Sequence, residues 1–271
     1  MRLRDTLARA GLGGAPVVLV ALVAWNAGNL IFFVVAGRLI GPDEYGTLAA
    51  LLAVTQIALV PAGALQVAVV RGESALAGAD VPGAVYRSAL RRAALWTPIG
   101  AVLLAGAVAA VGGAVGAPAG SLALTVAVIA PMPFLFLALG QLQSEHRFGV
   151  FSASFSLIGV PRPIELLPLL VVLPGVIAGL LASALSMLAA AGLAVWGARD
   201  RLRGAVAPTA AWRAFRRALG PLALGLGAVA VLTNLDLVAA EIALPDAEAG
   251  RFAAIAVLGK AVILVPQAVS I

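Results

Sequence analysis

Four charged residues stand inside stretches of sequence that are otherwise apolar, and their side chains are the ones best suited to chemistry. Arg162 and Glu165 lie three residues apart in GVPRPIELLP, so they share one face of a helix. Asp236 and Lys260 stand in two later apolar stretches. A charge at the centre of a membrane helix costs about 3 kcal/mol to insert, so such residues usually face a cavity or a charged partner.

The sequence leaves two interpretations open for several of these polar side chains. Asp236 could bind a proton or Na⁺ and couple its movement to transport, or it could pair with Lys260. The amides of Asn26, Asn29 and Gln56 also lie within apolar stretches. Hydrogen bonds between helices explain most such amides, and a polar wall for a hydroxyl-bearing cargo is the alternative.

The sequence lacks most of the residues that metal sites and catalytic sites require. The chain has no cysteine and a single histidine, His146, so thiolate or imidazole metal sites and cysteine or Ser-His-Asp catalysis are not expected. We therefore expect no metal, no cofactor and no enzyme. The net charge of +6 could suggest nucleic acid, but the basic residues gather in particular loops, as a membrane orientation signal does. We expect no nucleic-acid partner.

The composition is that of an all-α polytopic membrane protein. Of 271 residues, 62% are hydrophobic and 11% are charged, whereas soluble domains are roughly half apolar and a quarter charged. Apolar runs of about twenty residues, long enough to cross the hydrocarbon core, repeat along the chain. We predict eight transmembrane helices, near residues 16–40, 47–70, 94–115, 121–141, 150–173, 175–197, 218–243 and 250–271.

The distribution of basic residues predicts the orientation. Of the 18, Arg162 and Lys260 lie in predicted spans and Arg38 and Arg251 on one side, which leaves 18 − 4 = 14 on the other side with the N-terminus. Because basic loops stay in the cytoplasm, we expect a cytoplasmic N-terminus and a multi-pass protein of the cell (plasma) membrane. Two arginine-bearing stretches, VYRSALRRAALW (85–96) and AWRAFRRALG (211–220), either anchor helices at the interface or recognise an anionic lipid headgroup.

An internal repeat joins the two ends of the chain. NLIFFVVAGRLIGPDEYG begins at Asn29 and NLDLVAAEIALPDAEAG at Asn234, an offset of 234 − 29 = 205 that becomes 250 − 46 = 204 where Gly46 meets Gly250. Six predicted helices separate the copies, so both insert in the same direction and are related by an axis along the membrane normal. We expect a six-helix lobe over 1–205 and the first two helices of a second lobe over 206–271. Two full copies would need about 410 residues and twelve helices, so the chain is expected to be the front part of a longer protein.

The stretches RLIGPDEYGTLAALLAV, from Arg38, and NLDLVAAEIALPDAEAGRFAAIAVLGKAVILVPQA, from Asn234, resemble the polysaccharide (O-antigen-type) flippases. These belong to the multidrug, oligosaccharidyl-lipid and polysaccharide exporter superfamily. The resemblance implies two six-helix bundles that face each other in a V around a central cavity, the MATE-like arrangement. It also implies a cargo of undecaprenyl-pyrophosphate-linked oligosaccharide, flipped from the inner to the outer leaflet for polysaccharide biosynthesis.

If the resemblance holds, Arg162 is expected to contact the lipid pyrophosphate in a cavity, and Glu165 is expected to bind Arg162 in the resting state. The alternative is that the two residues only neutralise each other as a pair within one helix. The expected partners are the lipid-linked oligosaccharide, membrane lipids and H⁺ or Na⁺. A multidrug antiporter of the same superfamily is the alternative function and should favour acidic groups in its cavity. An integral membrane glycan enzyme would need a carboxylate pair or a His/Arg group in a sizeable loop, and the longest loop has neither.

Overall fold

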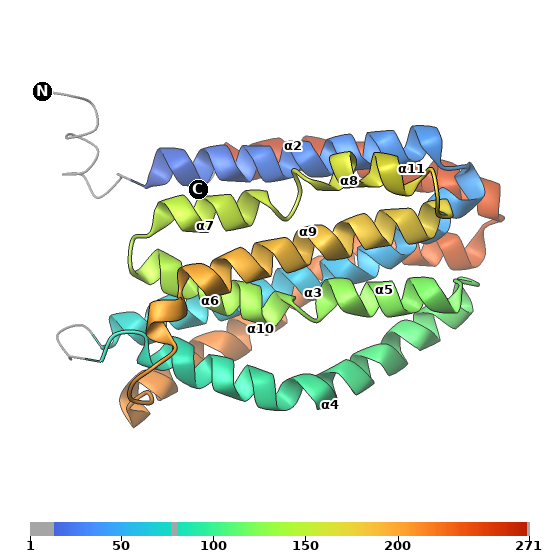
Figure 1. Cartoon of the computed structure of the whole chain (residues 1–271). Coiled ribbons are helices and arrows are strands. Elements are labelled where there is room, and N and C mark those ends of the chain that lie inside the picture. Colours follow the sequence, from blue (N-terminus) through green and yellow to red (C-terminus); the bar gives the residue numbers. More distant parts are fainter. Residues whose placement is uncertain (1–13, 77–80, 270–271) are drawn as a thin grey trace, which may run out of the picture.

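The computed structural model describes residues 14–76 and 81–269, and every regular element within these residues is a helix (Figure 1). Most of the helices run side by side along one direction. In chain order they are α2 (Ala15–Leu39), α3 (Pro42–Ser74), α4 (Ala84–Ala114), α5 (Ala119–Ile129), α6 (Met132–Ser144), α7 (Phe148–Ser156), α8 (Arg162–Leu169), α9 (Gly175–Gly197), the short 3₁₀ helix η1 (Arg199–Arg201), α10 (Thr209–Ala243) and α11 (Asp246–Val269).

Several of these helices are long and apolar enough to cross a membrane, as multi-pass membrane proteins require. Within the described residues five qualify, and a sixth is added if the two halves of α4, bent by 58°, form one span. Eight spans were predicted, and for five or six of them the structure has helices of the length and hydropathy that a span requires. The five are Pro16–Leu39, Pro42–Ser74, Gly120–Ser144, Gly175–Gly197 and Thr209–Ala243, and the bent pair is Ala84–Thr97 with Val102–Ala114.

Large apolar side chains cover much of the outer surface of the bundle. Leu103 is 70% exposed, Leu224 is 78% exposed and Leu232 is 80% exposed. In water such surfaces would be a liability, but lipid chains solvate them without cost. The surface is therefore of the kind that a membrane protein presents to lipid. The predicted cytoplasmic N-terminus includes residues 1–13, which lie outside the described residues.

Two helices begin earlier than the sequence predicted, inside the acidic turns. We expected helix starts at 47 and 250, but α3 begins at Pro42 and α11 at Asp246. Proline suits the first helical turn because its missing N–H needs no partner there. Acidic residues in the first turn, such as Asp43 and Glu248, also interact favourably with the positive end of the helix dipole.

The arginine-bearing stretches are parts of the following helices, not separate lead-ins. The prediction placed helix starts at 94 and 218, whereas α4 begins at Ala84 and α10 at Thr209. The early turns of these helices hold buried aromatic side chains: Tyr86 is 0% exposed and Phe215 is 3% exposed. Only one face of each stretch packs inward, and the arginines on the other face lower its mean hydropathy. A search for apolar runs therefore does not include these turns in the helices.

Two predicted helices are broken. The run 121–141 is divided between α5 and α6 near Pro131, although the two pieces together, Gly120–Ser144, still have the length and hydropathy of one span. The run 150–173 is divided between α7 and α8 near Pro161. Proline lacks the N–H that would continue the helix, so it favours such breaks. α7 has 9 residues and α8 has 8, so neither piece alone is long enough to cross a membrane, and the single span predicted for 150–173 is corrected to two short helices.

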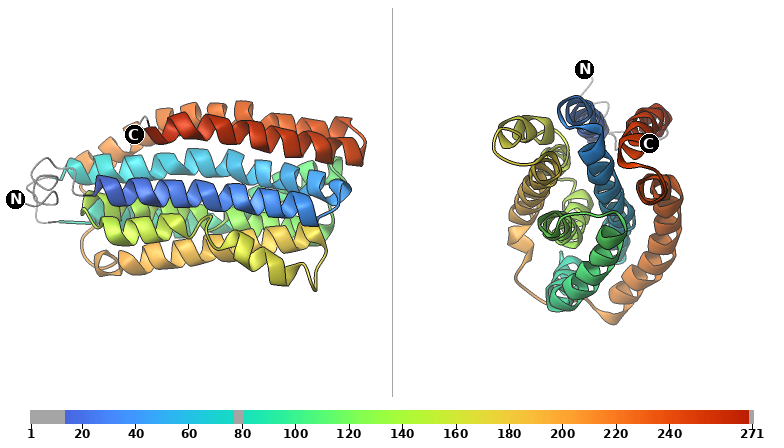
Figure 2. Two further views of the ribbon diagram at one scale, coloured as in Figure 1. Left: turned by 90° about the horizontal axis from the view of Figure 1, so that it is seen from above. Right: turned by 90° about the vertical axis from the view of Figure 1, so that its right-hand side faces the viewer.

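Helices α2 and α3 separate the later helices into two groups. α10 and α11 lie along one side of this pair, while α7, α8 and α9 lie along the other (Figure 2). The chain returns to α3 through α10, which runs against most of its length. The predicted division into lobes at residue 205 falls just before α10 begins at Thr209. Both the division and a V-shaped cavity between lobes stay predictions.

Candidate functional site

A buried arginine at the break in the chain near Pro161 connects α8 with α2. Arg162 is the first residue of α8 and is 3% exposed. Its Nη1 donates a hydrogen bond to Oδ1 of Asn29 on α2, at 2.8 Å, and its guanidinium carbon lies 5.7 Å from the ring centroid of Phe32. The Nε of Arg162 is buried and has no hydrogen-bond partner among the described residues.

Close packing of backbone places this arginine against α2. A Cβ added to Gly28 would lie 2.6 Å from the carbonyl carbon of Gly159, so the break after α7 touches α2 almost backbone to backbone. Glycine permits such an approach because it has no side chain. Asn29 follows Gly28 directly, so the amide reaches Arg162 just past the contact.

Glu165 does not pair with Arg162. Its Oε2 accepts a hydrogen bond from Ser186 Oγ on α9, at 2.8 Å, and no ion pair joins it to Arg162 in the described part of the chain. The predicted self-neutralising pair within one helix is therefore not formed. Spacing of three residues put both side chains on one helix, but their nearest polar partners come from two different neighbouring helices.

The arrangement leaves a positive charge in a poorly solvated position with a neutral partner. No acidic side chain forms an ion pair with Arg162 among the described residues, and an amide oxygen satisfies only one of the five N–H groups of a guanidinium. An incoming anion with several oxygens, such as a phosphate, could accept the remaining donors. The guanidinium therefore keeps donors that its described partner does not use.

The other predicted amides are not part of this site. Asn26 donates from Nδ2 to the Leu22 carbonyl of its own helix, at 2.9 Å. Gln56 on α3 lines a cavity of about 170 Å³ whose other walls include Trp25 and Phe136. That cavity is mainly apolar, so it does not form the polar wall that the sequence left open. Of the amides, only Asn29 lies with Arg162.

Asp236 and Lys260 form the pair that the sequence left as one of two possibilities. Lys260 Nζ on α11 donates to Asp236 Oδ1 on α10 at 2.8 Å. The side chains are 28% and 39% exposed, respectively, so the pair is only half-buried. It links α10 with α11 and leaves Asp236 neutralised by its neighbour.

The sequence did not identify a polar contact at the end of the bundle where the two acidic turns meet. Thr47 Oγ1 on α3 donates to Glu241 Oε1 on α10 at 2.7 Å, and the second oxygen of Glu241 is buried against Gly46. A Cβ on Gly46 would lie 3.1 Å from the backbone nitrogen of Gly250. Gly46 aligns with Gly250 in the internal repeat of the sequence. That alignment was the one sequence feature that pointed to these two glycines together.

A second unpredicted contact holds the opposite end of the bundle. The guanidinium of Arg87, 3% exposed, donates to the backbone carbonyls of Arg201, Arg203 and Ala205 at 2.6 to 2.8 Å. Glu73 accepts from the backbone N–H groups of Gly83, Val85 and Tyr86 at 2.9 to 3.0 Å and so caps the start of α4. The partners of Arg87 lie more than a hundred residues later in the chain, and all of these partners are backbone groups, which every residue has. No residue pattern therefore identifies them.

The described residues contain no group of three or more histidine, aspartate or glutamate side chains that could hold a metal ion. The helices and their exposed apolar surfaces define an all-helical protein of the multi-pass membrane type. Neither a family model, nor a curated protein, nor a solved structure matches the chain.

Proposed function

We propose that this chain belongs to a flippase that moves undecaprenyl-pyrophosphate-linked oligosaccharide from the inner to the outer membrane leaflet. The observation that carries the proposal is Arg162, a buried cation whose only hydrogen-bond partner among the described residues is the neutral amide of Asn29. A pyrophosphate carries the charge and the acceptor oxygens that this guanidinium lacks. Transport of this kind needs binding and release but no covalent catalysis.

The contact between the acidic turns supports the two-lobe part of the proposal. Gly46 and Gly250, which correspond in the repeat, approach each other closely. Equivalent residues that touch lie close to a two-fold axis, as in an isologous interface. A parallel repeat with its axis along the membrane normal has this property at the place where the lobes meet.

The test introduces Arg162→Gln at the chromosomal locus and measures polysaccharide on the cell surface. We expect export to fall roughly tenfold, the effect of losing about 1.4 kcal/mol of cargo binding, with the protein still present in the membrane. Arg38→Gln is the matched control, since it removes an exposed arginine from the end of α2. Normal export in the Arg162→Gln strain would remove this residue from the cargo path.

A second variant separates cargo binding from a structural role. Asn29→Leu removes the resting partner and leaves the cation in place, so export should be largely retained if Arg162 acts on the cargo. If Arg162 matters only as a support between α2 and α8, Asn29→Leu should lower export as much as Arg162→Gln. Unchanged export together with increased sensitivity to cationic drugs in the Arg162→Gln strain would favour the multidrug antiporter instead.

A further inference from the structure

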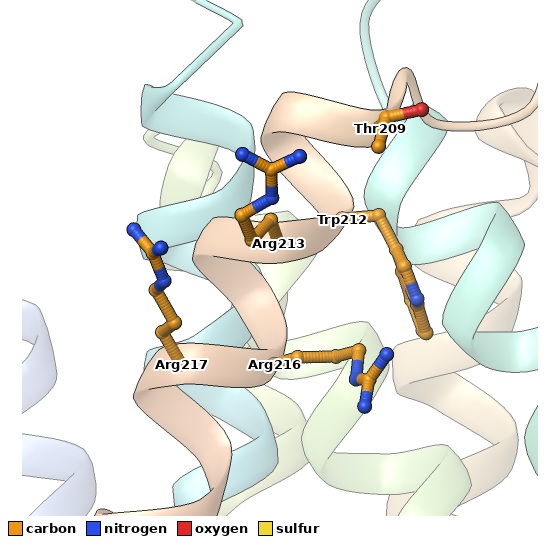
Figure 3. A pocket seen from close by; sticks show the side chains of 5 residues that line it. All are labelled: Thr209, Trp212, Arg213, Arg216 and Arg217. Carbon is orange, nitrogen blue, oxygen red and sulfur yellow. The ribbon is translucent and has the colours of Figure 1, made fainter.

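The start of α10 carries a cationic pocket that the proposed transport site does not include. The pocket has a volume of about 410 Å³ and is lined by Thr209, Trp212, Arg213, Arg216 and Arg217 (Figure 3). Trp212 and Arg216 project to one side of the helix, and Arg213 and Arg217 project to the other side. All lining residues come from the first nine residues of one helix, 209–217.

The three arginines have no charged partner within the described residues. Arg213, Arg216 and Arg217 are exposed, and none of them forms an ion pair with an acidic residue of that part of the chain. Three guanidinium groups within five residues repel one another. An anion bound beside them would reduce that repulsion, and a single arginine can hold a phosphate through two parallel hydrogen bonds.

The wall of the pocket is held in place by aromatic contacts. The guanidinium of Arg92, on α4, lies 3.8 Å from the ring centroid of Trp212. Trp212 also stacks on Phe215 with ring centroids 4.8 Å apart, and Phe215 is 3% exposed. Trp212 is thus fixed between a cation and a buried ring, so the pocket has one rigid side.

The length of α10 places the pocket at the level of lipid headgroups. The helix has 35 residues, which at about 1.5 Å each gives roughly 52 Å. The hydrocarbon core of a bilayer is about 30 Å thick and the whole bilayer with its headgroups about 40–45 Å. The apolar part of α10 begins after Arg217, so the arginines lie just outside the hydrocarbon, where tryptophan is also enriched.

We propose that this pocket binds the phosphate of an anionic membrane lipid at the membrane surface. Arg216, on the same side of the helix as Trp212, supplies paired donors for the phosphate oxygens, Arg213 and Arg217 add positive charge from the other side, and Trp212 contacts the glycerol and the upper acyl chain. The proposal stands apart from the transport function, because the pocket shares no residue with the Arg162 site. It differs from general attraction of basic residues to acidic membranes, because it requires the forked geometry of arginine at particular positions.

The test uses the fluorescence of Trp212 in the full chain, with the other three tryptophans, Trp25, Trp96 and Trp196, changed to Phe. The protein is reconstituted in phosphatidylcholine vesicles that contain a rising fraction of brominated phosphatidylglycerol or of brominated phosphatidylcholine. Bromine quenches tryptophan only at short range. We expect half-maximal quenching at a several-fold lower fraction of the anionic lipid, and equal quenching by the two lipids would overturn the proposal.

A charge-conserving variant tests the arginine geometry. Replacing Arg213, Arg216 and Arg217 by Lys keeps the topology signal and the net charge, but it removes the paired donors. We expect the required fraction of phosphatidylglycerol to rise roughly tenfold, and the single variant Arg216→Lys to show part of this rise. The matched control changes three exposed arginines outside the pocket to Lys, namely Arg71, Arg91 and Arg203.

Two results would contradict the proposal. If the pocket and control variants behave like the unchanged protein, the attraction is diffuse and no built site exists. If soluble inorganic pyrophosphate or phosphate displaces brominated phosphatidylglycerol at equal concentration, the ligand is a soluble phosphate and not a lipid. The lipid proposal is tested by quenching of Trp212, and the transport proposal by export in the Arg162 variants. Normal export in those variants would contradict the transport proposal and would not affect the lipid proposal.

Discussion

Four charged side chains inside predicted spans, Arg162, Glu165, Asp236 and Lys260, find a polar partner on another helix. Arg162 of α8 bonds to Asn29 of α2, Glu165 of α8 to Ser186 of α9, and Asp236 of α10 to Lys260 of α11. Lipid offers no hydrogen-bond partner, so these charged groups bond across helix interfaces, whereas a neutral amide such as that of Asn26 can bond to a carbonyl of its own helix. At the scale of single residues, these side chains act as links between helices.

The pair of Asp236 and Lys260 can be measured with a double-mutant cycle. We expect Asp236→Asn and Lys260→Gln each to lower the unfolding temperature of the detergent-solubilised protein, because each leaves one charge without its partner. The double variant should recover part of the loss, with a coupling energy of about 0.5–1 kcal/mol, since the pair is half-exposed.

The same cycle also tests whether Asp236 binds a coupling ion. If Asp236→Asn leaves stability unchanged while Lys260→Gln lowers it, the carboxylate is not paired in the working protein. A coupling energy near zero would give the same answer, and Asp236 would again be a candidate for binding H⁺ or Na⁺.

At the scale of elements, small residues decide where helices meet. α10 runs antiparallel to α3, from Phe215 near Gly72 at one end to Glu241 near Gly46 at the other. α11 reaches the start of α3 through Gly250, which lies directly against the backbone of Pro42. The second copy of the repeat therefore contacts the first in two places: α10 lies along α3, and the start of α11 lies against the start of α3.

Gly250→Ala should separate the two acidic turns. A Cβ at this position would lie 2.7 Å from the carbonyl carbon of Pro42, a backbone atom that cannot rotate away. Overpacking of this kind costs roughly 1–3 kcal/mol, more than the gain of about 1 kcal/mol from replacing glycine by alanine in a helix. We therefore expect a lower unfolding temperature in detergent.

Gly225→Ala is the control for this change. It lies on α10 and would meet no atom within 4 Å, so the helix-propensity gain should leave stability equal or slightly higher. If Gly250→Ala stabilises the protein as much as Gly225→Ala does, the turns are not in contact in the solubilised protein.

At the scale of the whole molecule, charge and packing together define two ends. One end holds the acidic turns at the starts of α3 and α11, and the other holds the arginine-rich segments that Arg87 and Glu73 join. The contact of Gly46 with Gly250 requires both acidic turns to lie on the same side of a membrane. The positive-inside rule predicts that this side is the outer one.

Cysteine labelling in intact cells tests this orientation directly, because the chain has no cysteine of its own. Asp43→Cys and Glu248→Cys, both at exposed positions, should react with a membrane-impermeant maleimide added from outside. Arg203→Cys, exposed at the opposite end, should react only after the membrane is permeabilised. Labelling of Arg203→Cys alone would reverse the predicted orientation, and labelling of only one acidic turn would contradict the fold.

The sequence by itself determined where most apolar helices lie. The run 175–197 coincides with α9, and 16–40 differs from α2 by one residue at each end. Helix starts at Pro42, Ala84, Thr209 and Asp246 were placed several residues too late, because acidic and arginine-bearing turns look like loops in a hydropathy profile. Apolar length is a local property of the chain, so it can be read without knowing the neighbours.

Only the tertiary structure decided which polar groups meet. Arg162 was expected beside Glu165, three residues away, but it lies against Asn29, 133 residues earlier in the chain. The backbone partners of Arg87 could not be predicted from the sequence, and the arginines at the start of α10 could be identified there but not the pocket that they line with Trp212. A hydrogen-bond partner is fixed by how helices cross, and crossings depend on close contacts such as Gly28 with Gly159, which bring distant segments together.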